Sequence, residues 1–240
     1  YPGGTNELTS GFGPGGGTYP YGGASHGGYG GCNTGMLYGS EATPTNHGSG
    51  GCGAAVGGIG ADGGGVVQID ADGTVTINGS ITADGEKGNS WHGGGGSGGS
   101  IWINCRTVAG SGMVRAAGGD GKDNGAAGGG GRIMIDYNSA AQAASGVPTL
   151  FFSTAGGMRN YSESFGIGWQ PGDLGTLHLN DNRLLGGIAK HSGQWISPAA
   201  SGAWALDSLT ISNGWLRFPS SGGVLTVTNG VLLTGGATLD

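Results

Sequence analysis

The stretch Gly98-Gly99-Ser100-Ile101-Trp102-Ile103-Asn104 carries the pattern that decides the fold. After two glycines, apolar side chains alternate with other residues, and a polar residue ends the stretch. Alternation with a period of two is typical of a β-strand that buries one face. The same order recurs at residues 63–70, 130–136 and, in a weaker form, 175–180. We therefore expect four equivalent strands.

A second, shorter element follows these strands. Ile81-Thr82-Ala83 matches Val114-Arg115-Ala116, and Phe152-Ser153-Thr154 is a third copy. A glycine-rich excursion comes after each copy. In a solenoid, each repeat buries one face against the next repeat. The sequence predicts an all-β fold, a right-handed parallel β-helix with long glycine-rich loops. The rival folds are an antiparallel β-sandwich and a glycine-rich polyproline-type bundle.

The composition excludes several structural and functional classes of protein. Glycine supplies 62 of 240 residues, but not at every third position, which excludes collagen. Ordering free glycine runs would cost about 1–2 kcal/mol per residue, so we expect them to pack backbone to backbone over one another or over residues 1–60. Nine Lys and Arg residues, a net charge of −6 and no basic run argue against a nucleic-acid partner. The chain contains no apolar run of about 18 residues, so the sequence does not predict a membrane-spanning segment.

The chain divides into two parts by composition. Residues 1–60 are a glycine- and tyrosine-rich segment expected to wrap the solenoid. Residues 61–240 form the predicted β-helix, expected to continue beyond residue 240 in a larger multidomain protein. The alanine-rich residues 139–145 suit one turn of helix. A Cys32–Cys52 bridge is one pairing of the three cysteines, and the alternation places Cys105 inward as a buried thiol.

The glycine-rich blocks 94–103, 110–119 and 128–133, taken in this order, resemble a glycine-rich β-helix repeat family. That family occurs in large secreted bacterial proteins and plant cell-surface proteins, and the resemblance covers about residues 50–180. It implies a β-helix fold and an extracellular, secreted location. Bacterial chains of this kind often accompany carbohydrate-active modules, and some carbohydrate-binding modules have a right-handed β-helix fold. The resemblance brings no catalytic motif with it.

Residues between the inward positions should form outward ladders across the strands. The first ladder is Gln68, Trp102, Met134 and His178. The second is Asp70, Asn104, Asp136 and Asn180. Neighbouring rungs lie about 4.8 Å apart. These side chains are either ordinary solvated strand residues or a flat strip on which an indole stacks on a sugar ring and Asp and Asn bind hydroxyl groups.

The tryptophans extend this surface. Trp91 lies in a glycine loop between polar residues, where a core role is unexpected, and an exposed indole suits a ligand or a neighbouring loop. Capping of the β-helix by loops is the alternative for Trp169, Trp195 and Trp204. The predicted ligand-binding residues are Trp91, Trp102, Asn104, Asp70, Asp136 and Gln68.

Metal and catalytic sites are weaker hypotheses. Asp70 and Asp72 are candidates for a Ca²⁺ site, with an Asx turn as the alternative, and no cofactor is required. Asp70 and Asp136 with Arg132 resemble the groups of a polysaccharide lyase or hydrolase. The Asp-Asp, Gly-His-Gly and Arg-x-Lys signatures of pectin-type hydrolases are missing, so we expect no catalysis.

The sequence therefore predicts non-catalytic binding of polysaccharide. The expected ligand is a plant cell-wall-type glycan such as xylan, because the chain has low charge and the predicted surface combines aromatic and amide groups. The protein would be a carbohydrate-binding, adhesin-like module of a secreted protein. The alternatives are a structural or adhesive surface solenoid without a small ligand and a β-helix polysaccharide lyase or hydrolase.

Overall fold

The computed structural model describes most of the chain. The described ranges are residues 1–5, 9–18, 20–32, 35–54, 58–89, 91–158, 170–181, 183–185, 192–196, 203–212, 214–217 and 224–239, with backbone alone at 185, 196, 203, 204 and 217. The elements are β1 (Val66–Thr76), β2 (Ser80–Thr82), β3 (Ser100–Ala109), β4 (Met113–Arg115), β5 (Arg132–Tyr137), α1 (Ser139–Ser145), β6 (Phe151–Ser153), β7 (Thr176–Leu179), η1 (Arg183–Leu185), β8 (Gly193–Ile196), β9 (Ala203–Ser212), β10 (Gly214–Arg217), β11 (Val224–Thr234) and β12 (Thr238–Leu239).

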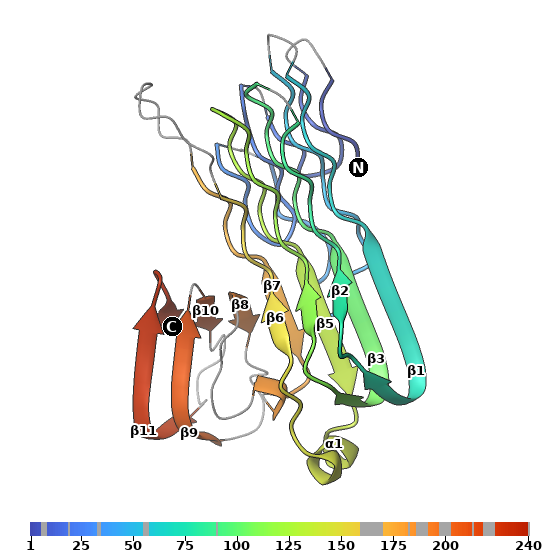
Figure 1. The fold of residues 1–240 in the computed structure, drawn as a ribbon, viewed down its shortest axis with the longest axis vertical. Helices are drawn as coiled ribbons and strands as arrows, with labels where there is room; N and C mark the ends of the chain where they lie inside the picture. The colour runs from blue at the N-terminus through green and yellow to red at the C-terminus, as the bar shows by residue number, and fades with distance from the viewer. Residues whose placement is uncertain are drawn as a thin grey trace.

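The strands form three sheets, and every pairing between them is parallel. The large sheet has the order β1-β3-β5-β7-β8-β10-β12, a second has β2-β4-β6, and a third has β11-β9. From β1 to β7 the chain alternates between the first two sheets (Figure 1). The all-β prediction is confirmed, and parallel pairing excludes an antiparallel sandwich. The sheets are open, so the closed coil of a right-handed β-helix stays a prediction.

The repeats found in the sequence match the register. Val67 pairs with Ile101, Ile101 with Ile133, and Ile133 with Leu177. In the second sheet Ile81, Val114 and Phe152 align in the same way. The expected turn of helix is α1. It begins after Asn138, whose side-chain oxygen accepts the Ala141 amide, as expected for an N-cap.

The strand half has a core made of side chains. The inward residues of β3, β5 and β7 are buried, and Phe152 packs into the same cluster from the second sheet. Burying one side chain of this size contributes about 1.5–3 kcal/mol. Trp195 is also a buried member of this core, so the expectation that it caps the β-helix under a loop is corrected. Cys105 is buried as predicted, and burial raises the pKa of its thiol.

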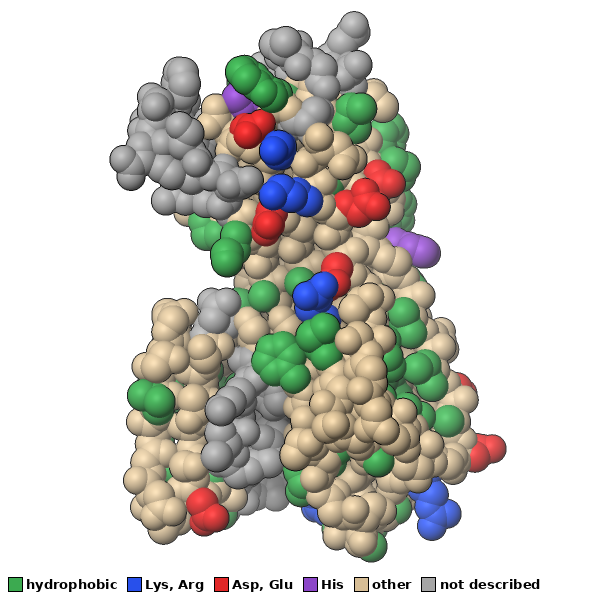
Figure 2. Space-filling view, viewed as in Figure 1, with side chains coloured by type: hydrophobic (Ala, Val, Ile, Leu, Met, Phe, Trp, Pro, Cys, Tyr) green, Lys and Arg blue, Asp and Glu red, His purple; other side chains and the backbone are tan. Residues whose placement is uncertain are grey.

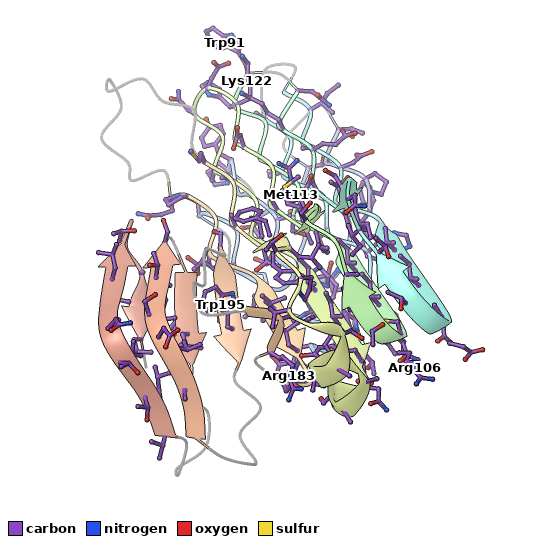
Figure 3. The ribbon with its side chains drawn as sticks, turned by 60° about the horizontal axis from the view of Figure 1, so that its bottom comes forward. Trp91, Arg106, Met113, Lys122, Arg183 and Trp195 are labelled. Carbon is purple, nitrogen blue, oxygen red and sulfur yellow. The ribbon has the colours of Figure 1, made fainter. Side chains whose placement is uncertain are left out.

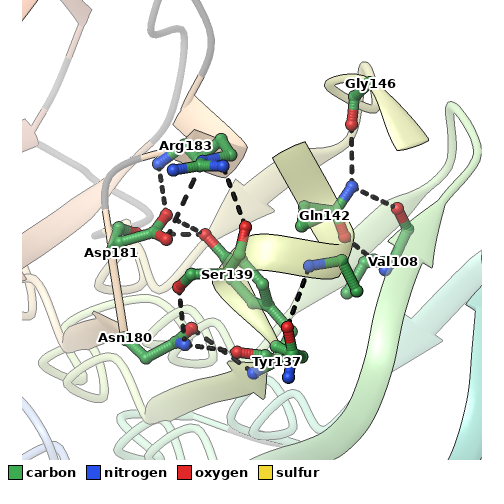
Figure 4. A network of polar contacts seen from close by, with 10 residues as sticks. Val108, Tyr137, Ser139, Gln142, Gly146, Asn180, Asp181 and Arg183 are labelled. Carbon is green, nitrogen blue, oxygen red and sulfur yellow. Dashed lines mark hydrogen bonds and ion pairs between the residues drawn. The ribbon is translucent and has the colours of Figure 1, made fainter. Parts of the chain in front are cut away.

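Side-chain hydrogen bonds close the end of the strand half where β5 stops (Figure 4). Gln142 of α1 takes the place of a neighbouring strand: its Oε1 accepts from Val108 N at 2.7 Å, and its Nε2 donates to Val108 O at 3.0 Å. The Tyr137 hydroxyl donates to the Asp181 carboxylate, and Arg183 donates to Ser139 O at 2.9 Å. These bonds hold α1 and η1 against the sheet.

The glycine-rich segments form a bundle of extended chains that continues directly from the strands (Figure 1). Segment 94–99, which leads into β3, donates a backbone hydrogen bond from every residue. Gly94 and Ser97 donate to segment 49–52, Gly95 and Gly98 to segment 126–129, and Gly96 and Gly99 to segment 83–86. The partner therefore recurs every third residue. This is the period of a polyproline II helix, which makes no hydrogen bonds within itself.

The acceptors of the same segment follow the same period. The oxygens of Gly94 and Ser97 accept from segment 61–64, and Gly96 O accepts from Gly119 N. A Cβ on Gly128 would overlap the carbonyl oxygen of Gly96, and a Cβ on Gly95 would overlap that of Gly119. The glycine runs are thus packed backbone to backbone, as expected. Their three-residue period is the one expected of the polyproline-type bundle, one of the rival folds.

The described residues among 1–54 belong to the same bundle. Cys52 N donates to Gly22 O, Gly4 N to Gly51 O, and Ala24 N to Gly95 O. The division of the chain at residue 60 stays a prediction. Cys32 and Cys52 form no disulfide. Within the described ranges, no helix is long and apolar enough to cross a membrane.

Candidate functional site

The predicted outward ladders exist in register. Gln68 aligns with Trp102, Trp102 with Met134, and Met134 with His178. In the second ladder Asp70 aligns with Asn104, and Asn104 with Asp136. The structure therefore brings together five of the six predicted binding residues on one face of the sheet: Gln68, Asp70, Trp102, Asn104 and Asp136.

This face is only partly open. Ser100 Oγ donates to Asn46 O at 2.7 Å, and the Arg132 guanidinium donates to Tyr38 O at 2.8 Å and 3.0 Å, so residues 38–46 cross the face where the strands begin. Met134 is buried and Trp102 is half-buried. A long flat strip for a sugar chain is therefore interrupted at its centre.

Two polar members of the second ladder bind each other. Asn104 Nδ2 donates to Asp70 Oδ1 at 2.9 Å, and both residues are exposed, as are Gln68 and Asp136. The lyase-like group of Asp70, Asp136 and Arg132 does not form, because the Arg132 side chain is buried and donates to Tyr38 O and Thr176 Oγ1. The hypothesis of a catalytic group at these residues is not supported by this geometry.

Trp91 lies elsewhere, at the far tip of the glycine-rich bundle. Figure 3 places it at the opposite end of the molecule from Arg106, which lies near the end of β3. Its side chain is 66% exposed, the largest value of any described aromatic residue. Trp102 and Trp215 are half-buried and Trp195 is buried. Trp169 and the side chain of Trp204 lie outside the described residues.

Three neighbouring turns meet at this tip in the described part of the chain. The Trp91 ring meets the His92 ring edge-on, with centroids 5.5 Å apart and planes at 65°, and His92 meets Tyr21 in the same way at 5.2 Å and 63°. Lys122 N donates to Gly93 O and Ala126 N donates to Tyr21 O, which links the third turn to the other two. The indole is therefore positioned by a chain of rings on a hydrogen-bonded scaffold.

The six predicted binding residues include neither His92 nor Tyr21. His92 is adjacent to Trp91 in the sequence, and Tyr21 is one of several tyrosines among N-terminal glycines. Only the sequence Trp91-His92 offered a signal. The approach of residue 21 to residue 92 depends on the order of segments in the bundle, which alternation and composition do not specify.

The charges around the tip are few and of both signs. Lys122 and Asp123 approach to 4.0 Å with both side chains partly exposed, a geometry worth little in free energy. On the face shown in Figure 2, charged side chains form small mixed groups and not one patch of a single sign. Such a surface suits a neutral ligand better than a polyanion.

The loop carboxylates bind groups of the protein itself. Asp62 Oδ1 accepts from Gly3 N, Asp84 accepts from Arg115 and Ala117 N, and Asp120 Oδ1 accepts from Met158 N. Among the described residues, no group of three or more His, Cys, Asp or Glu side chains could hold a metal ion. Asp72 is exposed, and its neighbour Asp70 is bound to Asn104.

A buried polar cluster joins the bundle to the strands. His26 is fully buried, stacks on Tyr38 with ring centroids 4.6 Å apart, and its Nδ1 lies 2.7 Å from Gly98 O. Burial and the nearby Arg132 charge lower the pKa of His26 to about 4, although the hydrogen bond to Gly98 opposes this. Burial raises the pKa of Tyr38 to about 12. This cluster is inside the molecule and serves the fold.

Comparison with known proteins adds no assignment: no family model, curated protein or solved structure matches this chain.

Proposed function

We propose that the protein binds a neutral polysaccharide without cleaving it, and that Trp91 is the main contact. The exposed indole at the tip of a rigid scaffold carries this proposal. A sugar ring presents a face of C–H groups that packs on an aromatic ring, and a fixed side chain loses little entropy on binding. The mixed, sparse charge around Trp91 supports a neutral ligand such as a xylan.

The proposal also includes the setting of the module. We place it outside the cell, as part of a larger protein, by its resemblance to secreted glycine-rich repeats. We further propose that β1 to β7 are coils of a right-handed parallel β-helix, supported by their alternation between two parallel sheets. In this arrangement the strand half carries the bundle, and the bundle presents the tip.

The test is calorimetry and affinity electrophoresis of the whole chain against xylans, glucans, mannans and pectins, with product analysis of the same samples. We expect saturable binding without new reducing ends or unsaturated products. Trp91→Ala should weaken it by about 30-fold, the effect of about 2 kcal/mol from truncating an aromatic hot spot. Trp102→Ala is the matched control on the ladder and should leave affinity unchanged.

Other outcomes contradict the proposal in different ways. Loss of binding in Trp102→Ala with retention in Trp91→Ala would move the site to the ladder. No binding to any glycan would favour the structural solenoid, and product release would favour a lyase or hydrolase. Binding abolished by EDTA and restored by Ca²⁺ would revive the metal hypothesis at Asp70 and Asp72.

A further inference from the structure

The turns at the tip of the bundle have an unusual backbone. Four non-glycine residues have a positive φ: Tyr21 at 69°, Cys32 at 53°, His92 at 62° and Asp123 at 52°. Asp and His adopt this left-handed region more readily than most residues, whereas a bulky residue such as Tyr is a rare outlier there. Each of the four lies in a turn of the glycine-rich part of the chain.

Glycine is the residue that fits such positions without strain, and this chain uses it freely. Gly13, Gly39 and Gly110 have positive φ elsewhere in the molecule. At Tyr21 and His92 the chain carries an aromatic side chain instead, at a cost in backbone energy. Strained positions persist where the side chain serves function, and an observed outlier supports a hypothesis of function.

The strained aromatic residues are those that contact the exposed indole in series. His92 meets Trp91 edge-on, and Tyr21 meets His92. We infer that the turns around Tyr21, Trp91–His92 and Lys122–Asp123 form one recognition surface for a single neutral sugar ring, in which Tyr21 and His92 are positioning residues that fix the orientation of Trp91. This inference rests on the proposed function and adds the composition and size of its site.

The number of exposed tryptophan side chains indicates how many sugar rings the site can bind. Of the tryptophans whose side chains the structure describes, Trp91 is the only exposed one. Directly behind the turns the segments pack backbone to backbone: a Cβ on Gly88 or on Gly125 would overlap the carbonyl oxygen of Gly93. One exposed indole platform binds one sugar ring, so affinity should level off at short chain length.

Substitution by glycine separates strain from function. Tyr21→Gly and His92→Gly relieve the left-handed backbone and should leave the melting temperature unchanged or raise it, while weakening binding of xylohexaose by about tenfold. Tyr21→Phe keeps the aromatic ring and should bind xylohexaose with the affinity of the wild type. His92→Asn tolerates the left-handed conformation but lacks the ring, so it should lose affinity with the fold intact. Asp123→Gly is the control turn variant without an aromatic ring.

The outcomes distinguish this inference from the proposed function. Xylohexaose, cellohexaose and mannohexaose are the probes, with the matching trisaccharides to test chain length. If Trp91→Ala loses binding but Tyr21→Gly and His92→Gly retain it, the positioning inference fails alone. A lower melting temperature with unchanged affinity would show that both rings serve only packing. Affinity that rises steadily from trisaccharide to hexasaccharide would contradict the one-ring site. No binding of any probe would overturn the proposed function itself.

Discussion

Segment 94–99 and strand β3 are consecutive parts of one extended stretch, yet different atoms stabilise them. In β3 alternate side chains enter a core, and Ile101 and Ile103 are fully buried. In segment 94–99 the buried atoms belong to the backbone except at Ser97, whose hydroxyl accepts from Ser49 N, and each amide bonds a neighbouring segment in a period of three. A sheet needs side chains on its faces, whereas the bundle needs glycine at the positions where two backbones meet. The position where glycine gives way to β-branched residues therefore sets the boundary between the halves.

We expect an added methyl group, as in a Gly→Ala substitution, to destabilise the fold most when it lies in the bundle. Gly128→Ala places a Cβ against the backbone of Gly96, which cannot move without separating two hydrogen-bonded segments. We expect loss of cooperative folding, beyond the ~1–3 kcal/mol typical of overpacking. Circular dichroism during thermal and urea unfolding measures this.

The control lies at the entrance to β1. A Cβ at Gly65 would have no atom within 4 Å, so Gly65→Ala should change the free energy of unfolding by less than about 0.5 kcal/mol. Equal effects of the two substitutions would show that the bundle is looser than the hydrogen bonds indicate.

The strand half should respond to loss of side-chain volume instead. Phe152 is fully buried between the sheets, and Phe152→Ala should lower the free energy of unfolding by about 3–5 kcal/mol through lost burial and a cavity. Urea unfolding followed by fluorescence measures it. Phe151→Ala, on the exposed neighbour, is the control. A loss below about 1 kcal/mol in Phe152→Ala would contradict a side-chain core in this half.

The buried cluster of His26 and Tyr38, which joins the bundle to the strands, should make the stability of the fold depend on pH. The pKa of His26 is about 4 in the fold and 6.5 when unfolded, so the unfolded chain binds more protons between these values. The contribution of neutral His26 is complete above pH 6.5 and is lost as pH falls towards 4, by about 3 kcal/mol in all.

Melting temperatures across this range measure the effect. His26→Asn, which keeps a donor for Gly98 O, should remove the step between pH 6.5 and 4. A pH profile identical in the wild type and in His26→Asn would show that other groups cause the acid sensitivity.

We expect the smallest effect on stability from a substitution at the tip. Trp91 is exposed and belongs to neither core, so Trp91→Ala should change the free energy of unfolding by less than about 0.5 kcal/mol while it weakens glycan binding. Differential scanning calorimetry of the purified variant checks this. A larger loss of stability would show that the indole serves the bundle, and the binding result would then need the glycine variants of Tyr21 and His92.

Much of the strand half was predictable because alternation reports directly on burial. The register of Gln68 with Trp102 and of Asp70 with Asn104 and Asp136 follows from the repeat alone. What lies over a strand does not follow from its own pattern. The covering at the start of β3 and β5 depends on residues 38–46, which accept from Ser100 and Arg132 through backbone carbonyls that any sequence offers.

The glycine-rich half was harder to predict. Glycine runs lack side-chain periodicity, so composition indicated packing but not the three-residue period or the order of segments. The distance between Trp91 and the ladder follows from that order. The structure places Trp91 at the tip and the ladder on the sheet, so the six predicted binding residues do not share one surface.

Amide hydrogen exchange of the whole chain, with and without xylohexaose, tests most directly whether a hydrogen-bonded glycine scaffold presents a binding tip. We expect slow exchange for residues 94–99, comparable to β3, because each amide is bonded to a neighbouring segment. Added glycan should slow exchange further only in peptides that cover residues 18–22, 89–93 and 121–125. Fast exchange at 94–99, or glycan protection confined to β1, β3 and β5, would contradict it.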